Sequence, residues 1–381
     1  MNDIHISKNA LLDKLTLFNV EIVKIEDIEK LKESGIFEQK TVKGVLRDFV
    51  KVDRVKEKGY FFKSGYTGLG DYGILQTNII NKNYGNLMCY SMEQYKNFIE
   101  IIKKDLQESY GITINTDFLK VSKMEINKTF PIDGTMGEYE RVFELLMAII
   151  PANARLKVKT TIANEEKGKA EENTFYATSN KTGKSKCFTE WKWYNKTKQL
   201  FTCYQIRLDE NYVRLEITLC GSKRIKAKNG LETNIFFMLS DELINEWFDK
   251  KIHAWIVEPI KKWRTEQEKK VKKIMRDCKK EDGYRWIDSC ITRILNEEID
   301  TCTGHKPLIL DVEEVIPLIN AKMYPDTDRR KRARKALRKY AKEHAWNLTK
   351  RDDLKLLEIL DKLELKEPMR VPTNEPLEKV G

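Results

Sequence analysis

Residues 212–219 constrain the fold of this chain most strongly, because apolar and polar side chains alternate there without interruption. A period of two is the signature of a β-strand with one face in a core. The aliphatic side chains would face the core, and the opposite face would carry Arg214, Glu216 and Thr218. The chain should therefore contain a sheet that presents charged groups on one face.

A second strand with the same pattern is predicted at residues 119–127. One face would carry Met124 and Ile126, and the other Lys123, Glu125 and Asn127. Both strands thus place a glutamate opposite an apolar face. Taken singly, each glutamate is equally well explained as an outward ion-pair partner on a solvated sheet.

The run at residues 191–200 combines tryptophans, lysines and a tyrosine. If it is extended, Trp191 and Trp193 anchor it in the core, and the other face carries Lys192, Tyr194 and Lys196. A phenol between two ammonium groups suits attack on a phosphodiester, because cations favour the phenolate and stabilise charge on phosphate. Alone, the run is more typical of a half-buried strand whose lysines reach solvent.

The three strands together predict a reactive site. If they are neighbours in one antiparallel sheet, Glu125, Glu216, Tyr194 and the nearby cations converge on its open face. Carboxylates would hold a divalent ion on a phosphate, the tyrosine would attack, and a lysine or arginine would stabilise the phosphorane. The products would be a 5′-phosphotyrosine and a free 3′-OH.

Composition agrees with a nucleic-acid partner. The formal net charge is +11 and the pI about 9.0, which favours a polyanion. The seven cysteines form no CxxC pair, and the four histidines are scattered, so a catalytic metal would need oxygen ligands and would be Mg²⁺ or Mn²⁺. No secretory signal and no run of about 18 apolar residues is present, so a cytoplasmic protein without membrane contact is expected.

The expected fold class is α+β, an antiparallel sheet followed by helices. The predicted organisation is an N-terminal extension at 1–60, a sheet domain at 60–235, a helical DNA-binding domain at 236–365 and a disordered tail at 366–381. Helices are expected at 91–109, 138–150, 240–279, 282–297, 312–323, 328–346 and 350–363, and residues 201–208 are expected to pair with the preceding run as a hairpin.

The densest positive run lies in the predicted helix at 328–346. A solvated charged face is one interpretation, and DNA contact is the favoured one, because clustered cations repel one another unless a polyanion is near. The predicted DNA-binding residues are Lys192, Lys198, Arg329, Arg330, Lys331, Arg332, Arg334, Lys335, Arg338 and Lys339.

The motif order resembles rolling-circle replication initiators, in particular filamentous-phage gene II proteins and plasmid initiators of the Rep_trans type. The resemblance rests on three segments in the order Met124-Glu125-Ile126, Tyr194-Asn195-Lys196 and Val213-Arg214-Leu215-Glu216. It covers roughly residues 60–235. It implies an initiator fold similar to the HUH nucleases but without their histidine pair.

The resemblance also implies roles. Tyr194 would be the nicking and joining nucleophile with Lys196 as its helper, Glu125 and Glu216 the metal ligands, and Arg214 a phosphate or structural partner. The family further implies a phage or plasmid protein that nicks an origin duplex, handles the single strand and recruits a host helicase and polymerase; a homodimer is left open. Glu125 replaces the usual Asp, and Gln199 replaces the usual Glu.

Three alternatives stay open. The chain could be a non-catalytic DNA-binding regulator of replication or copy number, or a conjugative relaxase, although the missing histidine pair argues against the latter. Another tyrosine could be the nucleophile, the rivals being Tyr176, Tyr204 and Tyr212. None of these has a lysine two residues on, so Tyr194 is preferred.

Overall fold

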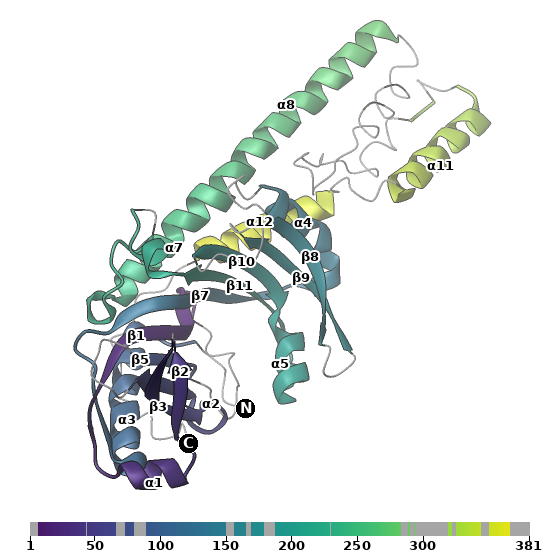
Figure 1. The fold of residues 1–381 in the computed structure, drawn as a ribbon. Helices are drawn as coiled ribbons and strands as arrows, with labels where there is room; N and C mark the ends of the chain where they lie inside the picture. The colour runs from purple at the N-terminus through teal and green to yellow at the C-terminus, as the bar shows by residue number, and fades with distance from the viewer. Residues whose placement is uncertain are drawn as a thin grey trace.

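The protein folds around one large antiparallel sheet with helices packed against it (Figure 1). The structure is a computed structural model, and it describes residues 7–42, 44–65, 73–79, 89–149, 156–164, 169–178, 187–228, 230–282, 289, 293, 319–321, 325–343 and 350–365. The mixed helix and strand content confirms the expected antiparallel α+β core. The predicted helices at 282–297 and 312–323 and the tail at 366–381 lie almost entirely outside these residues.

The sheet has eleven strands in the order β2-β3-β4-β5-β1-β7-β11-β10-β9-β8, with β6 paired to β1. Every pairing between named strands is antiparallel. The strands are β1 (Leu11–Ile25), β2 (Phe37–Val42), β3 (Val45–Arg54), β4 (Tyr60–Gly65), β5 (Gly73–Thr77), β6 (Ile112–Asn115), β7 (Lys120–Ile132), β8 (Leu156–Asn164), β9 (Lys169–Thr178), β10 (Phe188–Asn195) and β11 (Asn211–Cys220).

The helices lie between and after the strands. They are α1 (Ile28–Glu33), α2 (Val55–Lys58), α3 (Met92–Tyr110), α4 (Glu140–Ile149), α5 (Lys196–Tyr204), α6 (Ser222–Ile225), α7 (Asp241–Ile252), α8 (Glu258–Glu281), α11 (Thr327–Glu343) and α12 (Lys350–Glu364). Short 3-10 turns occupy Met136–Tyr139 and Phe236–Met238, and a π-helical turn at His253–Val257 joins α7 to α8. Within the described residues, no helix is long and apolar enough to cross a membrane.

The two faces of the central strands differ as the alternation predicts. On β10, Trp191 and Trp193 are buried, and the Trp193 ring lies 5.4 Å from that of Phe143 on α4. Aliphatic side chains of β7, β11 and α12 join the same hydrophobic cluster. Helices α4 and α12 therefore cover the apolar face, and Figure 1 shows α5 on the other side of the sheet.

One buried cation interrupts the apolar face. Lys128 of β7 points toward α12 and donates from Nζ to the carbonyl oxygens of Leu363 and Leu365 at 2.5 and 2.6 Å. The last carbonyls of a helix lack intrahelical partners, and the negative end of the helix dipole attracts a cation. Lys128 thus fastens the end of α12 to the sheet.

Several predicted helices are confirmed. Ser91 caps α3 and forms a capping box with Gln94, as the serine before an amphipathic run indicates. Within the predicted helix at 240–279, a π-helical turn separates α7 from α8, and Pro259 lies in the first turn of α8, where its missing N–H is tolerated. The helices expected at 328–346 and 350–363 are α11 and α12.

The expected hairpin at residues 201–208 is wrong. The strand ends at Asn195, whose side chain accepts a hydrogen bond from the Lys198 backbone N–H at 2.8 Å and so caps helix α5. An asparagine before a polar run is an N-cap signal that outweighs the strand propensity of the preceding aromatics. Residues 196–204 therefore turn away from the sheet as a helix.

The N-terminal segment is not peripheral to the sheet. Strand β1 lies between β5 and β7, in the middle of the strand order. Apolar residues of α7, α8 and α12 share one hydrophobic cluster with residues of strands β1, β7, β10 and β11. The predicted boundary at residue 60 therefore divides a continuous sheet, and the helices next to the predicted boundary at 236 pack onto that sheet.

Candidate active site

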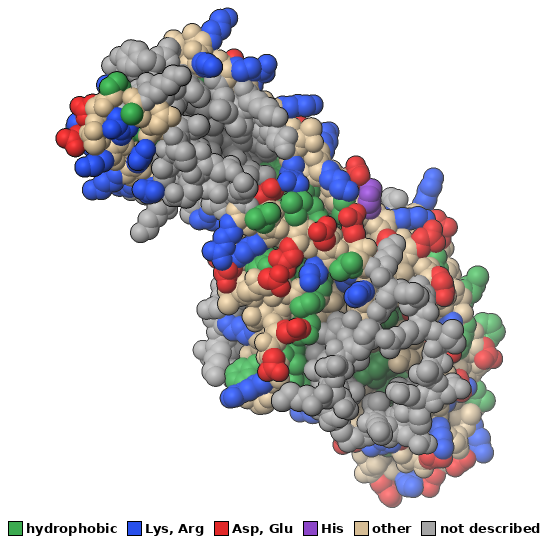
Figure 2. Space-filling model, turned by 180° about the vertical axis from the view of Figure 1, so that it is seen from behind, with side chains coloured by type: hydrophobic (Ala, Val, Ile, Leu, Met, Phe, Trp, Pro, Cys, Tyr) green, Lys and Arg blue, Asp and Glu red, His purple; other side chains and the backbone are tan. Residues whose placement is uncertain are grey.

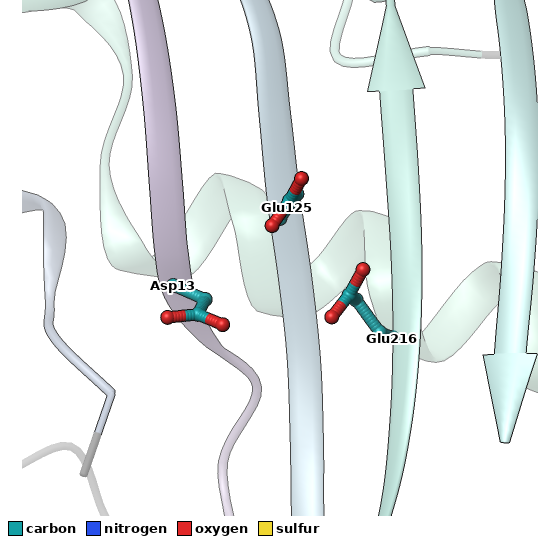
Figure 3. Close-up of side chains that lie close together, drawn as sticks. All are labelled: Asp13, Glu125 and Glu216. Carbon is teal, nitrogen blue, oxygen red and sulfur yellow. The ribbon is translucent and has the colours of Figure 1, made fainter. Parts of the chain in front are cut away.

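Three buried carboxylates meet on the face of the sheet opposite α4 and α12. They belong to Asp13 on β1, Glu125 on β7 and Glu216 on β11, which are neighbouring strands (Figure 3). One carboxylate oxygen from each lies within 4.8 Å of the others. The structure thus brings the two predicted glutamates together and adds an aspartate that the sequence analysis missed.

A β-bulge places Asp13 in this group. Leu12 pairs with Ile126 and Lys14 with Glu125, so β1 has one more residue than β7 at this point. Leu12 and Leu15 are both buried in the core, and Asp13 and Lys14 between them both turn to the opposite face. Bulges re-aim side chains in this way, often beside functional sites.

Lysines surround the acidic group. Lys192 Nζ lies 2.8 Å from Glu216 Oε1 and 3.2 Å from Glu190 Oε1. Burial opposes ionisation of Glu216, but the Lys192 ammonium outweighs it and lowers the pKa of the carboxyl. Lys123 donates to Glu125, and Lys14 lies 4.0 Å from the same carboxylate. Clustered carboxylates repel one another, and these cations offset part of that repulsion.

The donor set fits a divalent cation. Three carboxylates that converge within 4.8 Å offer only oxygen ligands, the ligand type that Mg²⁺ and Mn²⁺ prefer. All three side chains are buried, and buried charges are normally paired or bound to a metal. Asp13, Glu125 and Glu216 are therefore the residues that would hold the ion.

The Tyr194 hydroxyl adjoins the acidic group. It donates to Glu216 Oε2 at 3.2 Å, and its side chain is 8% exposed. Burial, and then the neighbouring Glu216 carboxylate, raise the pKa of the phenol well above its usual value. The expectation that nearby cations favour the phenolate is wrong for this structure, because an anion and not an ammonium group contacts the hydroxyl.

Lys196 lies beside Tyr194 but not on the same strand. It occupies the first turn of α5, is fully buried, and donates from Nζ to Gln199 Oε1 at 2.8 Å. Its ammonium lies 5.8 Å from the centroid of the Tyr194 ring. Burial, and then the Arg214 charge, lower the pKa of Lys196 to about 7. Gln199, noted in the sequence as a departure from the family, thus holds this lysine.

Arg214 supports the site from within the sheet. The guanidinium is fully buried, with Nε donating to Thr129 Oγ1 at 2.7 Å and an NH group to Asp13 Oδ2 at 3.4 Å. Of the two predicted roles, the geometry favours the structural one, since Arg214 fixes the Asp13 carboxylate and has no surface for a phosphate.

Asn127 lies next to Glu216 in the register of β7 and β11. Its Oδ1 accepts from the Cys89 thiol at 3.0 Å, whereas its buried Nδ2 has no hydrogen-bond partner among the described residues. An unpaired buried donor is costly. Within the described part of the chain, Asn127 Nδ2 is thus a buried amide donor that could bond a further oxygen atom.

The predicted DNA-binding residues divide into three groups. Lys192 belongs to the acidic group, where its ammonium contacts Glu216. Lys198 is half-buried on α5. The cations of α11 lie on a helix at the far end of the molecule from the acidic group (Figure 1), where Figure 2 shows lysine and arginine side chains crowded together.

The rival tyrosines are less well placed. Tyr212 donates to Glu210, and Tyr204 is partly exposed on α5; among the described residues, neither hydroxyl is hydrogen-bonded to the three carboxylates. Tyr176 lies on β9, opposite Lys192 in the register, and its side chain lies outside the described part of the structure. Tyr194 remains the predicted nucleophile.

Comparison with known proteins adds little. No protein-family model matches the chain, and no curated protein matches it. Among solved structures, a rolling circle replication initiator protein from Geobacillus stearothermophilus is similar at 14% identity and a TM-score of 0.32, covering 65% of this chain and 85% of that one. At that score the likeness carries no argument about this chain.

Proposed function

We propose that this protein is a rolling-circle replication initiator that nicks and rejoins DNA through Tyr194, with Mg²⁺ or Mn²⁺ as cofactor. The observation that carries the proposal is the hydrogen bond from the Tyr194 hydroxyl to Glu216, one of three converging carboxylates. A nucleophile beside a metal-ligand set on one sheet face is the arrangement that phosphodiester transesterification needs. The three sequence motifs that resemble initiators supply Glu125, Tyr194 and Glu216, whereas Asp13 lies outside them.

The reaction forms one phosphorus–oxygen bond and breaks another. The Tyr194 oxygen attacks phosphorus, its proton passes to Glu216 Oε2, and the bond from phosphorus to the 3′ oxygen breaks. The fragment downstream of the nick stays on the protein through its 5′ phosphate, as a phosphotyrosine, and the 3′ oxygen of the upstream fragment takes a proton from solvent. Rejoining is the reverse, with the 3′-OH as nucleophile, so no water or energy source is consumed.

Before DNA binds, the site disfavours loss of the Tyr194 hydroxyl proton. Glu216 bonds Lys192 through one oxygen and Tyr194 through the other, and the phenol keeps its proton because its pKa is raised. A divalent cation held by the three carboxylates would supply the positive charge that stabilises both the phenolate and the phosphate. Asn127 Nδ2 is available to donate to a phosphate oxygen on the same face.

Supply of DNA to this site would involve the basic helix α11. Its exposed cations suit phosphate contacts with an origin duplex, and the resemblance implies a cytoplasmic protein of phage or plasmid origin that recruits a host helicase and polymerase. A conjugative relaxase remains the alternative within the same chemistry. The roles of α11 and of the host partners depend on the proposed nicking activity.

The test uses a pool of random single-stranded oligonucleotides labelled at the 3′ end, incubated with the protein and Mn²⁺. The label should stay on the protein in denaturing gels, because the 5′ end of the cleaved fragment becomes covalently attached. Tyr194→Phe should abolish the adduct, and Tyr212→Phe, a matched change on the adjacent strand, should not.

One observation favours a non-catalytic regulator, namely that the Tyr194 phenol is buried and that burial raises its pKa. The regulator interpretation predicts DNA binding without any covalent product at any Mg²⁺ or Mn²⁺ concentration. An adduct that persists in Tyr194→Phe would instead show that another residue is the nucleophile. Either result would overturn the proposed role of Tyr194.

A further inference from the structure

The sheet face that carries the acidic group continues toward the other edge of the sheet. Cross-strand partners share a face, and one row of partners runs from Phe61 on β4 through Gln76 and Thr16 to Lys123 on β7. Lys123 donates to Glu125 of the acidic group. Strands β3, β4, β5 and β1 thus extend the site face without interruption.

This part of the face carries aromatic rings between cations. A parallel row links Lys51, Lys63, Ile74 and Phe18 in register. Lys63 Nζ lies 4.9 Å from the ring centroid of Phe49, and Lys51 Nζ lies 6.0 Å from that of Phe61. Each lysine is therefore held next to a phenyl ring by a cation–π contact.

The rings are not part of the core. The core residues of the same strands are the alternate ones, such as Val50, Val52 and Phe62, which are completely or almost completely buried. Phe18, Phe49 and Phe61 are half-buried, and Ile74 is 43% exposed. A strand face turned away from the core normally carries polar residues, so phenyl rings spaced along this one need another explanation.

We propose that this face, defined by Phe18, Phe49, Phe61, Lys51 and Lys63, binds single-stranded nucleic acid and leads it to the acidic group. Aromatic rings stack on bases irrespective of sequence, and lysines beside them neutralise phosphates. At about 4.8 Å per strand, the four steps from β7 to β3 span roughly 19 Å, which is enough for several nucleotides. The claim that the nucleic acid is led to the acidic group rests on the proposed function, whereas the claim that this face binds it does not.

Charge supports nucleic acid over other occupants. Lys51 pairs in register with Lys63, and like charges opposite one another destabilise a sheet unless a counter-charge is present. Glu38 lies 3.6 Å from Lys63 and offsets only part of this charge. Single-stranded nucleic acid would cover the phenyl rings with its bases and neutralise the lysines with its phosphates. A purely apolar partner would leave the lysine charges without a counter-charge.

Binding is measured on the full chain by fluorescence anisotropy, with a labelled oligothymidylate of about 20 nucleotides and another of about six, in a Tyr194→Phe background so that nothing is cleaved. The variant is Phe49→Leu with Phe61→Leu, which keeps the apolar volume but removes the rings. The matched control is Phe37→Leu on β2, whose side chain packs against the core instead.

The double variant should bind the longer oligonucleotide at least about tenfold more weakly, because each stacked base contributes substantially to affinity. The Phe37→Leu control should bind it like the parent. A second variant, Lys51→Gln with Lys63→Gln, should lower the slope of log affinity against log salt by about 1.4, two phosphate contacts at about 0.7 each.

Unchanged binding and an unchanged salt slope would overturn the proposal. If the double variant alters the oligomeric state and leaves oligonucleotide binding intact, the face is an interface between copies and the proposal is equally wrong. If the proposed nicking activity is wrong, the wild type forms no covalent adduct with DNA. That result is distinct from the binding measurements, which are made in the Tyr194→Phe background and do not depend on cleavage.

Discussion

Replacement of Lys196 by methionine should change how the stability of the protein depends on pH. The Lys196 side chain is fully buried, and burial together with the Arg214 charge lowers its pKa to about 7. In the unfolded chain the same ammonium regains an ordinary pKa near 10.4. Methionine has a similar length and no titratable group, so it removes this difference and keeps most of the packing.

The sign follows from proton binding. Between about pH 7 and pH 10 the unfolded chain keeps the proton on Lys196 and the folded protein does not, so the free energy of unfolding rises with pH by about 1.4 kcal/mol per unit. Below pH 7 both states are protonated and the full cost of the buried charge is present. From pH 7 to pH 9 the wild type should therefore gain roughly 2 kcal/mol relative to Lys196→Met.

The assay is urea unfolding at pH 7, 8 and 9, with Lys198→Met as a control two residues along the same helix. Lys198 is in contact with solvent, so that variant should follow the wild type. If the free energy of unfolding changes with pH in the same way in the wild type and in Lys196→Met, the pKa of Lys196 is not lowered in the folded protein. The electrostatic description of the Tyr194 surroundings would then be wrong.

Three further outcomes are expected. Mn²⁺ at about 100 times its Kd should raise the wild-type free energy of unfolding by about 2.7 kcal/mol, and Glu125→Gln should lose most of this gain in thermal melts; equal gains would exclude Glu125 as a ligand. Thr129→Val should cost about 1–3 kcal/mol in urea unfolding, because Arg214 Nε loses its acceptor, whereas Thr129→Ser should cost much less. Removing the charges of Arg332 and Lys335 should lower the salt slope of duplex DNA binding by about 1.8, and an unchanged slope would exclude their contact with phosphate.

Much of the site was predictable because strand periodicity is a strong local signal. Glu125, Glu216 and Tyr194 each follow from an alternating pattern, and the register of β7, β11 and β10 brings them onto one face. Which strands are neighbours is a long-range property that no local pattern contains. The convergence of these residues therefore had to be assumed until the sheet order was known.

Asp13 escaped prediction for a physical reason. A strict period of two puts Asp13 on the same face as Leu15 and Leu17, which are buried in the core. The bulge shifts the pattern by one residue and turns Asp13 to the site face. The available signal was the polar pair Asp13-Lys14 between two core leucines, which a regular strand cannot accommodate.

The chemistry around Tyr194 was harder to predict than its position. The sequence places lysines on either side, and a hydroxyl near ammonium groups was expected to ionise more easily. In the structure Lys192 contacts Glu216, and Lys196 donates to Gln199 and lies over the Tyr194 ring instead of at its hydroxyl, so the hydroxyl faces a carboxylate. Side-chain partners depend on the helix start at Asn195, a boundary of the kind that sequence patterns locate least reliably.

The central claim is that Tyr194 forms the covalent bond to DNA beside Asp13, Glu125 and Glu216. The most direct measurement is peptide mapping by mass spectrometry after incubation with single-stranded DNA and Mn²⁺, followed by nuclease digestion. We predict a nucleotide 5′-phosphate on the peptide that contains Tyr194, absent when Mn²⁺ is chelated. A modified Tyr204 or Tyr212, or no modified peptide from protein that binds the DNA, would contradict the claim.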